Sequence, residues 1–279
     1  MDLDLTARLE RLLSEQVTAL TSQFTALPVD LRVIRAALGL GIEVRSAPTQ
    51  HGELLRADEG AGTIVVYHPS RSELNVHRAR FTVAHEIGHF LVDARGGYQP
   101  ISRSDYWALE TLCDRFAGSL LLPAHLLKLS LRPTGKLDPK SLLGDLKSIS
   151  NDGQTSPEAA ARRIVEVLSR NGKLVEFAQI RQWNPKGRRV DKRRPAPIAE
   201  VDWATGGLLD IGRRTRIRQG DPLTDALTAA IREMNRPAAL AERVVLRQSP
   251  RWSLALRAEG ARTLWLCAVG ESVEASTLQ

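Results

Sequence analysis

The sequence has little of what a secreted or membrane-bound protein needs. Only two cysteines, Cys113 and Cys267, occur among its 279 residues, and they lie far apart, so we expect reduced thiols rather than a disulfide. No apolar run approaches the roughly 18 residues that span a membrane, and the chain begins with acidic residues where a signal peptide would be basic. We therefore expect a cytoplasmic protein with no membrane partner.

The sequence also lacks a recognisable nucleic-acid-binding motif. No helix-turn-helix or zinc-finger pattern is evident, although the formal net charge is +7. Basic residues gather in two clusters, which are Lys186, Arg188, Arg189, Lys192, Arg193 and Arg194, then Arg213, Arg214, Arg216 and Arg218. Such clusters can bind phosphate backbones without sequence preference, which makes nucleic acid an alternative partner. A solvated loop is the commoner explanation of such a run of charge.

Shifts in the pattern divide the chain into three parts. In residues 1–26, leucines recur at helical spacing, which predicts an N-terminal helical arm. Residues 27–170 combine helical segments with short strand-like runs, which predicts an α+β domain. Residues 173–279 have a mostly β texture, which predicts a smaller mixed, β-rich C-terminal domain. A sensory role for this last domain is a hypothesis, because no motif in it names a ligand.

The expected elements can be placed by residue number. Helices are expected over 3–24 and 30–38, with two more between 138 and 170. Strands of a small first sheet are expected at 41–45, 53–56 and 63–67. The C-terminal part is expected to contain strands at 173–183, 198–204, 243–248, 252–257 and 263–269, and one helix at 221–234.

The motif with the most chemical content is His85-Glu86-Ile87-Gly88-His89, which lies in an apolar segment. Two histidines four residues apart share one face of a helix and can bind one ion, while Glu86 can reach a water beside that ion. The alternative is a buried helix with two hydrogen-bonded histidines. Because a glutamate and two histidines on a buried segment are costly without a partner, the motif indicates a zinc hydrolase.

Two histidines leave the ion short of the three protein ligands that a catalytic zinc usually has. A metzincin would have a histidine at Arg95 and a glycine at Val92, so that class is excluded. Asp93 lies about 12 Å beyond His85 along a helix axis, too far for one ion to bind both histidines and Asp93. We therefore expect Asp93 to be solvated or to contact a ligand side chain.

Glu110 is a better candidate for the third ligand. It lies in an amphipathic stretch that ends at Pro123, and Asp114 shares its face of the expected helix. A glutamate on a second helix packed across the first can complete the site, and an aspartate one turn later can accept a ring N–H from a metal-binding histidine. The alternative is that both acids form the solvated edge of an amphipathic helix.

The segments around these residues resemble the ImmA/IrrE family of bacterial metallo-endopeptidases. The likeness is strongest at residues 81–89, 110–117 and 120–123, is weaker at 27–44, and covers roughly residues 27–170. In that family the equivalent histidines and the downstream glutamate bind the metal, and the motif glutamate is the catalytic base. One departure is Ser119, which stands where many members have an acidic residue.

The resemblance implies a zincin-like metallopeptidase domain with one zinc ion, for which another divalent metal is an alternative. His85, His89 and Glu110 would bind the ion, and Glu86 would be the base. It also implies the substrate, a bacterial helix-turn-helix transcriptional repressor whose cleavage induces a stress or mobile-element response. The group that stabilises the oxyanion is left open, because Tyr98, Tyr106 and His125 lie near the motif without decisive spacing.

An alternative function belongs to a different class. The chain could be a DNA-binding or scaffold-type stress regulator with a structural metal, in which the basic clusters carry the activity. A structural zinc is normally closed by four protein ligands, so a site with an open position argues against this alternative.

Overall fold

The computed structural model describes residues 3–47, 51–56, 62–68, 75–96, 102–131, 137–182, 197–205, 216–218, 245–249, 252–259 and 263–270. The chain folds as two compact units. Unit 1 consists of residues 1–130 and 149–163, and unit 2 of residues 131–148 and 164–279. Helices and strands occur in both parts of the chain, so the predicted α+β class is confirmed.

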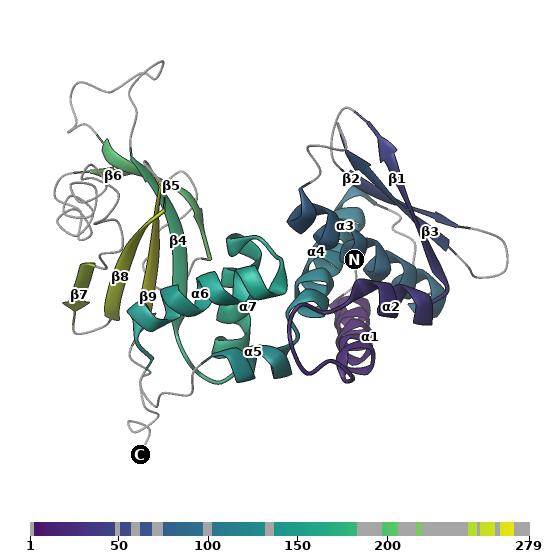
Figure 1. Cartoon of the computed structure of the whole chain (residues 1–279), viewed down its shortest axis with the longest axis horizontal. Coiled ribbons are helices and arrows are strands. Elements are labelled where there is room, and N and C mark those ends of the chain that lie inside the picture. The colour runs from purple at the N-terminus through teal and green to yellow at the C-terminus, as the bar shows by residue number, and fades with distance from the viewer. Residues whose placement is uncertain are drawn as a thin grey trace. The chain divides into compact units, whose positions relative to one another are not determined.

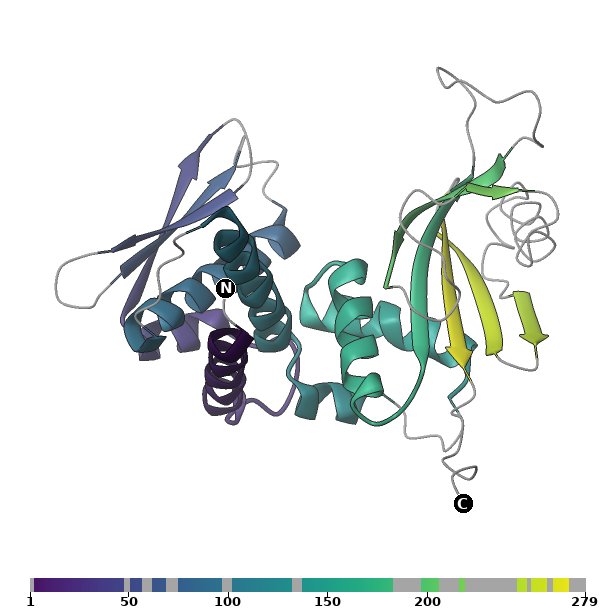
Figure 2. The same cartoon turned by 180° about the vertical axis from the view of Figure 1, so that it is seen from behind.

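Apart from a short helix at Ala124–Ser130, which was not predicted, the helices of the described chain lie close to the expected positions (Figures 1 and 2). They are α1 (Leu3–Thr21), α2 (Leu31–Ala37), α3 (Val76–Leu91), α4 (Arg103–Leu121), α5 (Ala124–Ser130), α6 (Pro139–Gly153) and α7 (Pro157–Ser169). Side-chain caps explain where three of them begin, because each cap accepts a hydrogen bond from a free backbone N–H of the first turn. The caps are Asp30 for α2, Asn75 for α3 and Ser102 for α4.

Three strands of unit 1 form a small sheet in the order β1-β3-β2. They are β1 (Leu40–Ser46), β2 (His51–Arg56) and β3 (Gly62–His68), which confirms the three predicted strands. β3 pairs in parallel with β1 and antiparallel with β2. The central strand is buried at Ile64, Val65 and Val66, and the sheet packs against α3, as Figures 1 and 2 show.

Helix α1 packs on α4. Leu9, Leu13 and Val17 recur at helical spacing and are all buried, which gives α1 one apolar face. An ion pair between Glu10 on α1 and Arg115 on α4 lies beside this contact. The predicted N-terminal helical arm is therefore a packed part of unit 1.

The sheet of unit 2 is antiparallel throughout, in the order β6-β5-β4-β9-β8-β7. Its strands are β4 (Val175–Gln182), β5 (Pro197–Ala204), β6 (Arg216–Arg218), β7 (Val245–Ser249), β8 (Trp252–Glu259) and β9 (Thr263–Gly270). The five predicted C-terminal strands are thus confirmed, and β6 was not predicted. The helix expected at 221–234 and the basic cluster at 186–194 lie outside the described residues.

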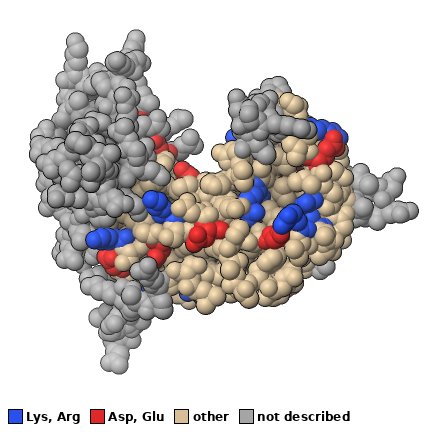
Figure 3. Space-filling model, viewed as in Figure 1, with Lys and Arg blue, Asp and Glu red and all other residues tan. Residues whose placement is uncertain are grey.

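The described surface carries charges of both signs. Figure 3 shows Lys and Arg side chains next to Asp and Glu side chains on the described part of the face in view. Among the described residues, none of the helices combines the length and the apolar character that crossing a membrane requires.

Candidate metal centre

Helix α3 presents the motif residues on two of its faces. Val83, Ala84, Ile87 and Leu91 are buried and fix the rotation of the helix against the rest of unit 1. This rotation leaves His85 and His89 partly accessible on a neighbouring face, one turn apart. Their rings lie close together, with the two Nε2 atoms 3.0 Å apart.

Helix α4 adds a carboxylate to the pair of rings. The Glu110 oxygens lie 3.4 Å from Nε2 of His85 and 3.2 Å from Nε2 of His89. His85, His89 and Glu110 are the group of described side chains that could hold a metal ion, with all ligand atoms within 4.8 Å of one another. The structure therefore brings together the three residues that the sequence predicted as ligands.

The spacing of the three donor atoms fits a small ion. Nitrogen and oxygen ligands lie about 2.0–2.2 Å from zinc, so two ligands of one tetrahedral ion are roughly 3.3 Å apart. The two Nε2 atoms are 3.0 Å apart, Oε1 of Glu110 lies 3.2 Å from His89, and Oε2 of Glu110 lies 3.4 Å from His85, all close to this value. Two imidazoles and one carboxylate also form a donor set that zinc takes in catalytic sites.

Asp114 holds the orientation of His85. Its Oδ1 lies 2.8 Å from Nδ1 of His85 and accepts a hydrogen bond from the ring, which leaves Nε2 directed at the other donors. Burial acts to lower the pKa of His85, but hydrogen bonds to Asp114 and Glu110 outweigh it and raise the pKa to about 9. Hydrogen bonds from the rings of His85 and His89 hold the pKa of Glu110 well below its usual range.

We expect metal binding to release a proton from His85. In the metal-free protein at pH 7 this ring is charged, because its pKa lies above the ordinary 6.5, and a metal ligand must be neutral. Zinc binding at pH 7 should therefore release about one proton, and the release should fade as the pH rises through 9. Calorimetric titrations in buffers of different ionisation enthalpy measure this number directly.

Asp114→Asn provides the comparison for this titration. Without the carboxylate, the pKa of His85 should fall, so fewer protons are released at pH 7. A binding heat at pH 7 that does not depend on the buffer would contradict the expectation.

Glu86 lies on α3 between the two histidines, and its side chain is buried, with 8% of the residue exposed. Burial raises its pKa, while the rings of His89 and His85 act in the opposite direction. A carboxylate with a raised pKa can take a proton and give it up again near neutral pH, as a general base must.

Two glycines allow close approaches around these residues. A Cβ on Gly52 of β2 would lie 2.2 Å from Cγ2 of Thr82 and 3.2 Å from Oε1 of Glu86, so only glycine lets this strand lie so close to α3. A Cβ on Gly88 would lie 3.0 Å from Phe116 and 3.4 Å from Cys113, where α3 meets α4. The role of Gly52 could not be predicted from sequence, because Thr82 and Glu86 are distant from it in the chain.

We expect Gly52→Ala to lower the stability of unit 1 by about 1–3 kcal/mol, since the added methyl overlaps Thr82. Gly118→Ala on α4 is the matched control. A Cβ there meets nothing within 4 Å, so this change should stabilise the helix by about 0.5–1 kcal/mol. Urea unfolding followed by circular dichroism compares the two. Equal midpoints for both variants would show that β2 moves away from α3 without penalty.

The other candidate residues that the sequence suggested have different positions. Asp93 lies in a π-helical turn, Val92–Gly96, and is not part of the three-residue group. A ring nitrogen of His125 lies 3.2 Å from the carbonyl oxygen of Phe24. Tyr98 lies outside the described residues. Tyr106 lies on α4 one turn before Glu110, whose negative charge raises the pKa of the phenol above its usual value.

Fold and site together define a small α+β domain in which a helix with two histidines packs against a helix with a glutamate. Residues 37–164 match the model of the IrrE N-terminal-like domain, Peptidase_M78. This part of the chain is therefore similar to that peptidase family, which confirms the resemblance to ImmA/IrrE proteins.

One solved structure has a similar fold over most of the chain, that of a Mycobacterium tuberculosis transcriptional regulator. The TM-score is 0.50 and the sequence identity 16%, and the match covers 97% of this chain and 77% of that one. At this identity the likeness concerns the fold. No curated protein sequence matches the chain.

Proposed function

We propose that the protein is a zinc-dependent endopeptidase. The observation that carries this proposal is the set of three donor atoms, from His85, His89 and Glu110, with the buried carboxyl of Glu86 on the same helix. A bound zinc ion would supply Lewis-acid activation of a water molecule and of the scissile carbonyl. Glu86 takes a proton from the attacking water and passes it to the leaving amine.

An edge strand lies beside Glu86, and an extended peptide substrate could pair with it. β2 is an edge strand of the sheet, and Gly52 places its backbone next to Glu86. Adding an extended substrate to such an edge provides main-chain hydrogen bonds without requiring a particular side chain. This arrangement supports a peptide rather than a small amide as the substrate.

The proposed substrate is a bacterial helix-turn-helix repressor, and cleavage would induce a stress or mobile-element response. Support comes from the IrrE N-terminal-like family match and from the fold shared with a protein described as a transcriptional regulator. A cytoplasmic location follows from such a substrate.

Labelling of new protein N-termini in cells tests the proposal. Cells expressing the wild type or Glu86→Gln are compared before and after DNA damage, with Glu15→Gln, an exposed change on α1, as the control. A new terminus within a repressor in wild type and Glu15→Gln cells, absent with Glu86→Gln, is expected. If metal-free and Glu86→Gln forms keep the full biological effect while charge reversal at Arg188, Arg189, Lys192 and Arg193 abolishes it, the DNA-binding or scaffold-type regulator replaces the peptidase.

We propose Tyr106 as the donor that stabilises the oxyanion. Tyr106→Phe removes the hydroxyl beside Glu110 and should lower kcat on the order of 10–100-fold, with the zinc content unchanged. Trp107→Phe, at the neighbouring exposed aromatic residue, is the control and should have little effect. Rates are measured with the peptide that the wild type cleaves fastest in a quenched-fluorescence library. A rise in KM with kcat unchanged in both variants would instead indicate a shared role of the two rings in binding.

A further inference from the structure

A second site lies on a different side of α3. A pocket of about 520 Å³ within unit 1 is lined there by Ala79, Arg80 and Val83, which are not on the face that carries His85 and His89. Its volume falls within the range of about 300–1,000 Å³ that is typical of small-molecule sites. None of its lining residues belongs to the three-residue metal group.

One wall of the pocket is apolar and partly open to solvent. Ile42 and Val44 of β1 are two residues apart, so they share a face of the sheet, and they are 44% and 45% exposed. Val66 and Val83, which also line the pocket, are buried. These four β-branched side chains offer an aliphatic surface that a hydrocarbon chain can cover.

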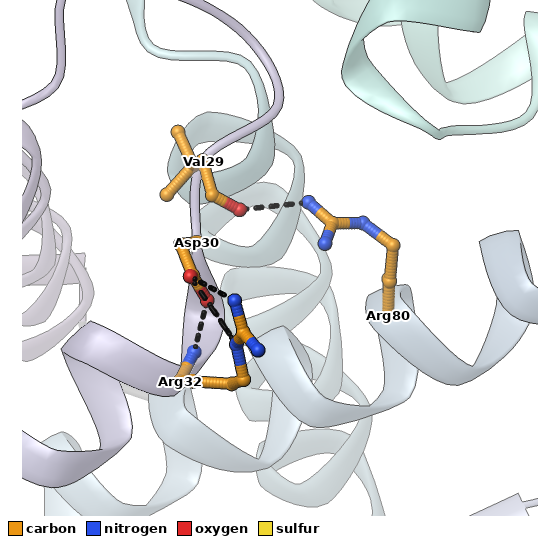
Figure 4. Close-up of polar contacts among 4 residues, drawn as sticks. All are labelled: Val29, Asp30, Arg32 and Arg80. Carbon is orange, nitrogen blue, oxygen red and sulfur yellow. Dashed lines mark hydrogen bonds and ion pairs between the residues drawn. The ribbon is translucent and has the colours of Figure 1, made fainter.

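The polar part of the pocket centres on Arg80. Its side chain extends from α3 to the segment before α2, where Nη2 donates a hydrogen bond of 2.9 Å to the carbonyl oxygen of Val29 (Figure 4). Nε is buried and has no acceptor within the described chain. Among the described residues no carboxylate forms an ion pair with this guanidinium. Burial lowers the pKa of Arg80 from its usual value, so the site disfavours the charge in its present surroundings.

Asp30 attracts Arg80 through space but forms its ion pair with Arg32. Asp30 is engaged by Arg32, which donates from Nε and Nη2 to its two oxygens over 2.8–3.2 Å (Figure 4). Arg35, also in the lining, donates to the carbonyl oxygen of Leu40. The pocket thus has three arginines against one aspartate, and its net charge is positive.

We propose that this pocket binds a small amphipathic carboxylate, with the carboxylate head beside Arg80 and the aliphatic body on Ile42, Val44 and Val66. A carboxylate matches a planar guanidinium and adds the charge-assisted hydrogen bonds that Arg80 lacks. A single negative charge suits the site better than a phosphate dianion, because Asp30 already carries a negative charge next to Arg80. The pocket has room for such a ligand, and none of the three candidate metal ligands lines it.

Isothermal titration calorimetry of the full chain with straight-chain carboxylates tests the proposal. Octanoate is expected to bind saturably with one site per chain, and octanamide, which has no charge, at least about tenfold more weakly. Because each buried methylene contributes about fourfold in affinity, octanoate should bind on the order of tenfold more tightly than hexanoate.

Variants locate the binding. Val44→Asp places a negative charge on the apolar wall, and Arg80→Gln removes the guanidinium; each should weaken octanoate binding at least about tenfold. Val33→Asp is the matched control, since Val33 is another exposed valine, 42% against 45% for Val44, and does not line the pocket. Because Val44 is exposed, its variant should fold even if Arg80→Gln does not.

Several results would overturn the proposal. They are the lack of saturable octanoate binding below about 1 mM, equal binding of octanamide, and unchanged binding by Val44→Asp. Tighter binding of octyl phosphate than of octanoate would overturn the choice of a carboxylate. The titrations need no substrate and no turnover, so their failure leaves the proposed peptidase untouched.

Discussion

Glu86→Gln is expected to remove peptide cleavage while the zinc content stays at the wild-type level. The glutamine keeps the size of the side chain but cannot take a proton from water, and general-base catalysis contributes about 10²–10⁴-fold to a rate. Glu86 is not one of the three donors, so its replacement leaves the metal-binding atoms in place. Zinc is counted by elemental analysis of the purified protein, and cleavage is measured with the quenched-fluorescence library.

The control for this change is Glu15→Gln, which makes the same replacement at an exposed position of α1. It should cleave as fast as the wild type. A zinc-loaded Glu86→Gln that also cleaves at the wild-type rate would show that another group takes the proton. A Glu86→Gln without zinc would show instead that the side chain supports the site, and the two outcomes are separated by the metal analysis.

Removing any one of the three donors should have the largest effect on the metal. A tightly bound zinc ion contributes about 10–16 kcal/mol through four ligands, so the loss of one ligand should weaken binding on the order of 10²–10³-fold. We expect this for His85→Ala, His89→Ala and Glu110→Ala. Competition with a chromophoric chelator gives the dissociation constants.

Variants of the neighbouring acids distinguish the metal ligands from residues that only orient them. Asp114→Asn keeps all three donors and loses only the carboxylate that orients His85, so it should weaken zinc binding by about 10–100-fold. Asp93→Asn, outside the three-residue group, should change it little. If Asp93→Asn weakened binding as much as Glu110→Ala, the assignment of the third ligand would be wrong.

Much of the fold could be predicted because its signals are local. Apolar periodicity placed the helices and strands, and the observed ends of α2, α3 and α4 follow capping side chains next to them in the chain. The order β1-β3-β2 was not predicted, because β1 and β3 are joined in parallel with β2 between them in sequence. Such pairing depends on how the strands pack on α3, which no short segment encodes.

The grouping of His85, His89 and Glu110 could be predicted for a similar reason. Two histidines four residues apart have one arrangement on a helix, and the periodicity that predicted α4 also placed Glu110 and Asp114 on one face. Only the crossing of the two helices had to be assumed. The surroundings could not be predicted, because Gly52 and the pocket at Arg80 join segments that are far apart in the chain.

The contact at Gly88 bears on which ions the candidate metal centre would accept. With Phe116 and Cys113 within about a methyl group of Gly88, the two helices cannot come closer, and side-chain packing keeps them from moving apart. The backbone therefore limits how far apart the helix positions that carry the imidazole pair and the carboxylate can lie. Such a limit on spacing would favour divalent ions of matching radius, in addition to those that prefer nitrogen ligands, before any substrate arrives.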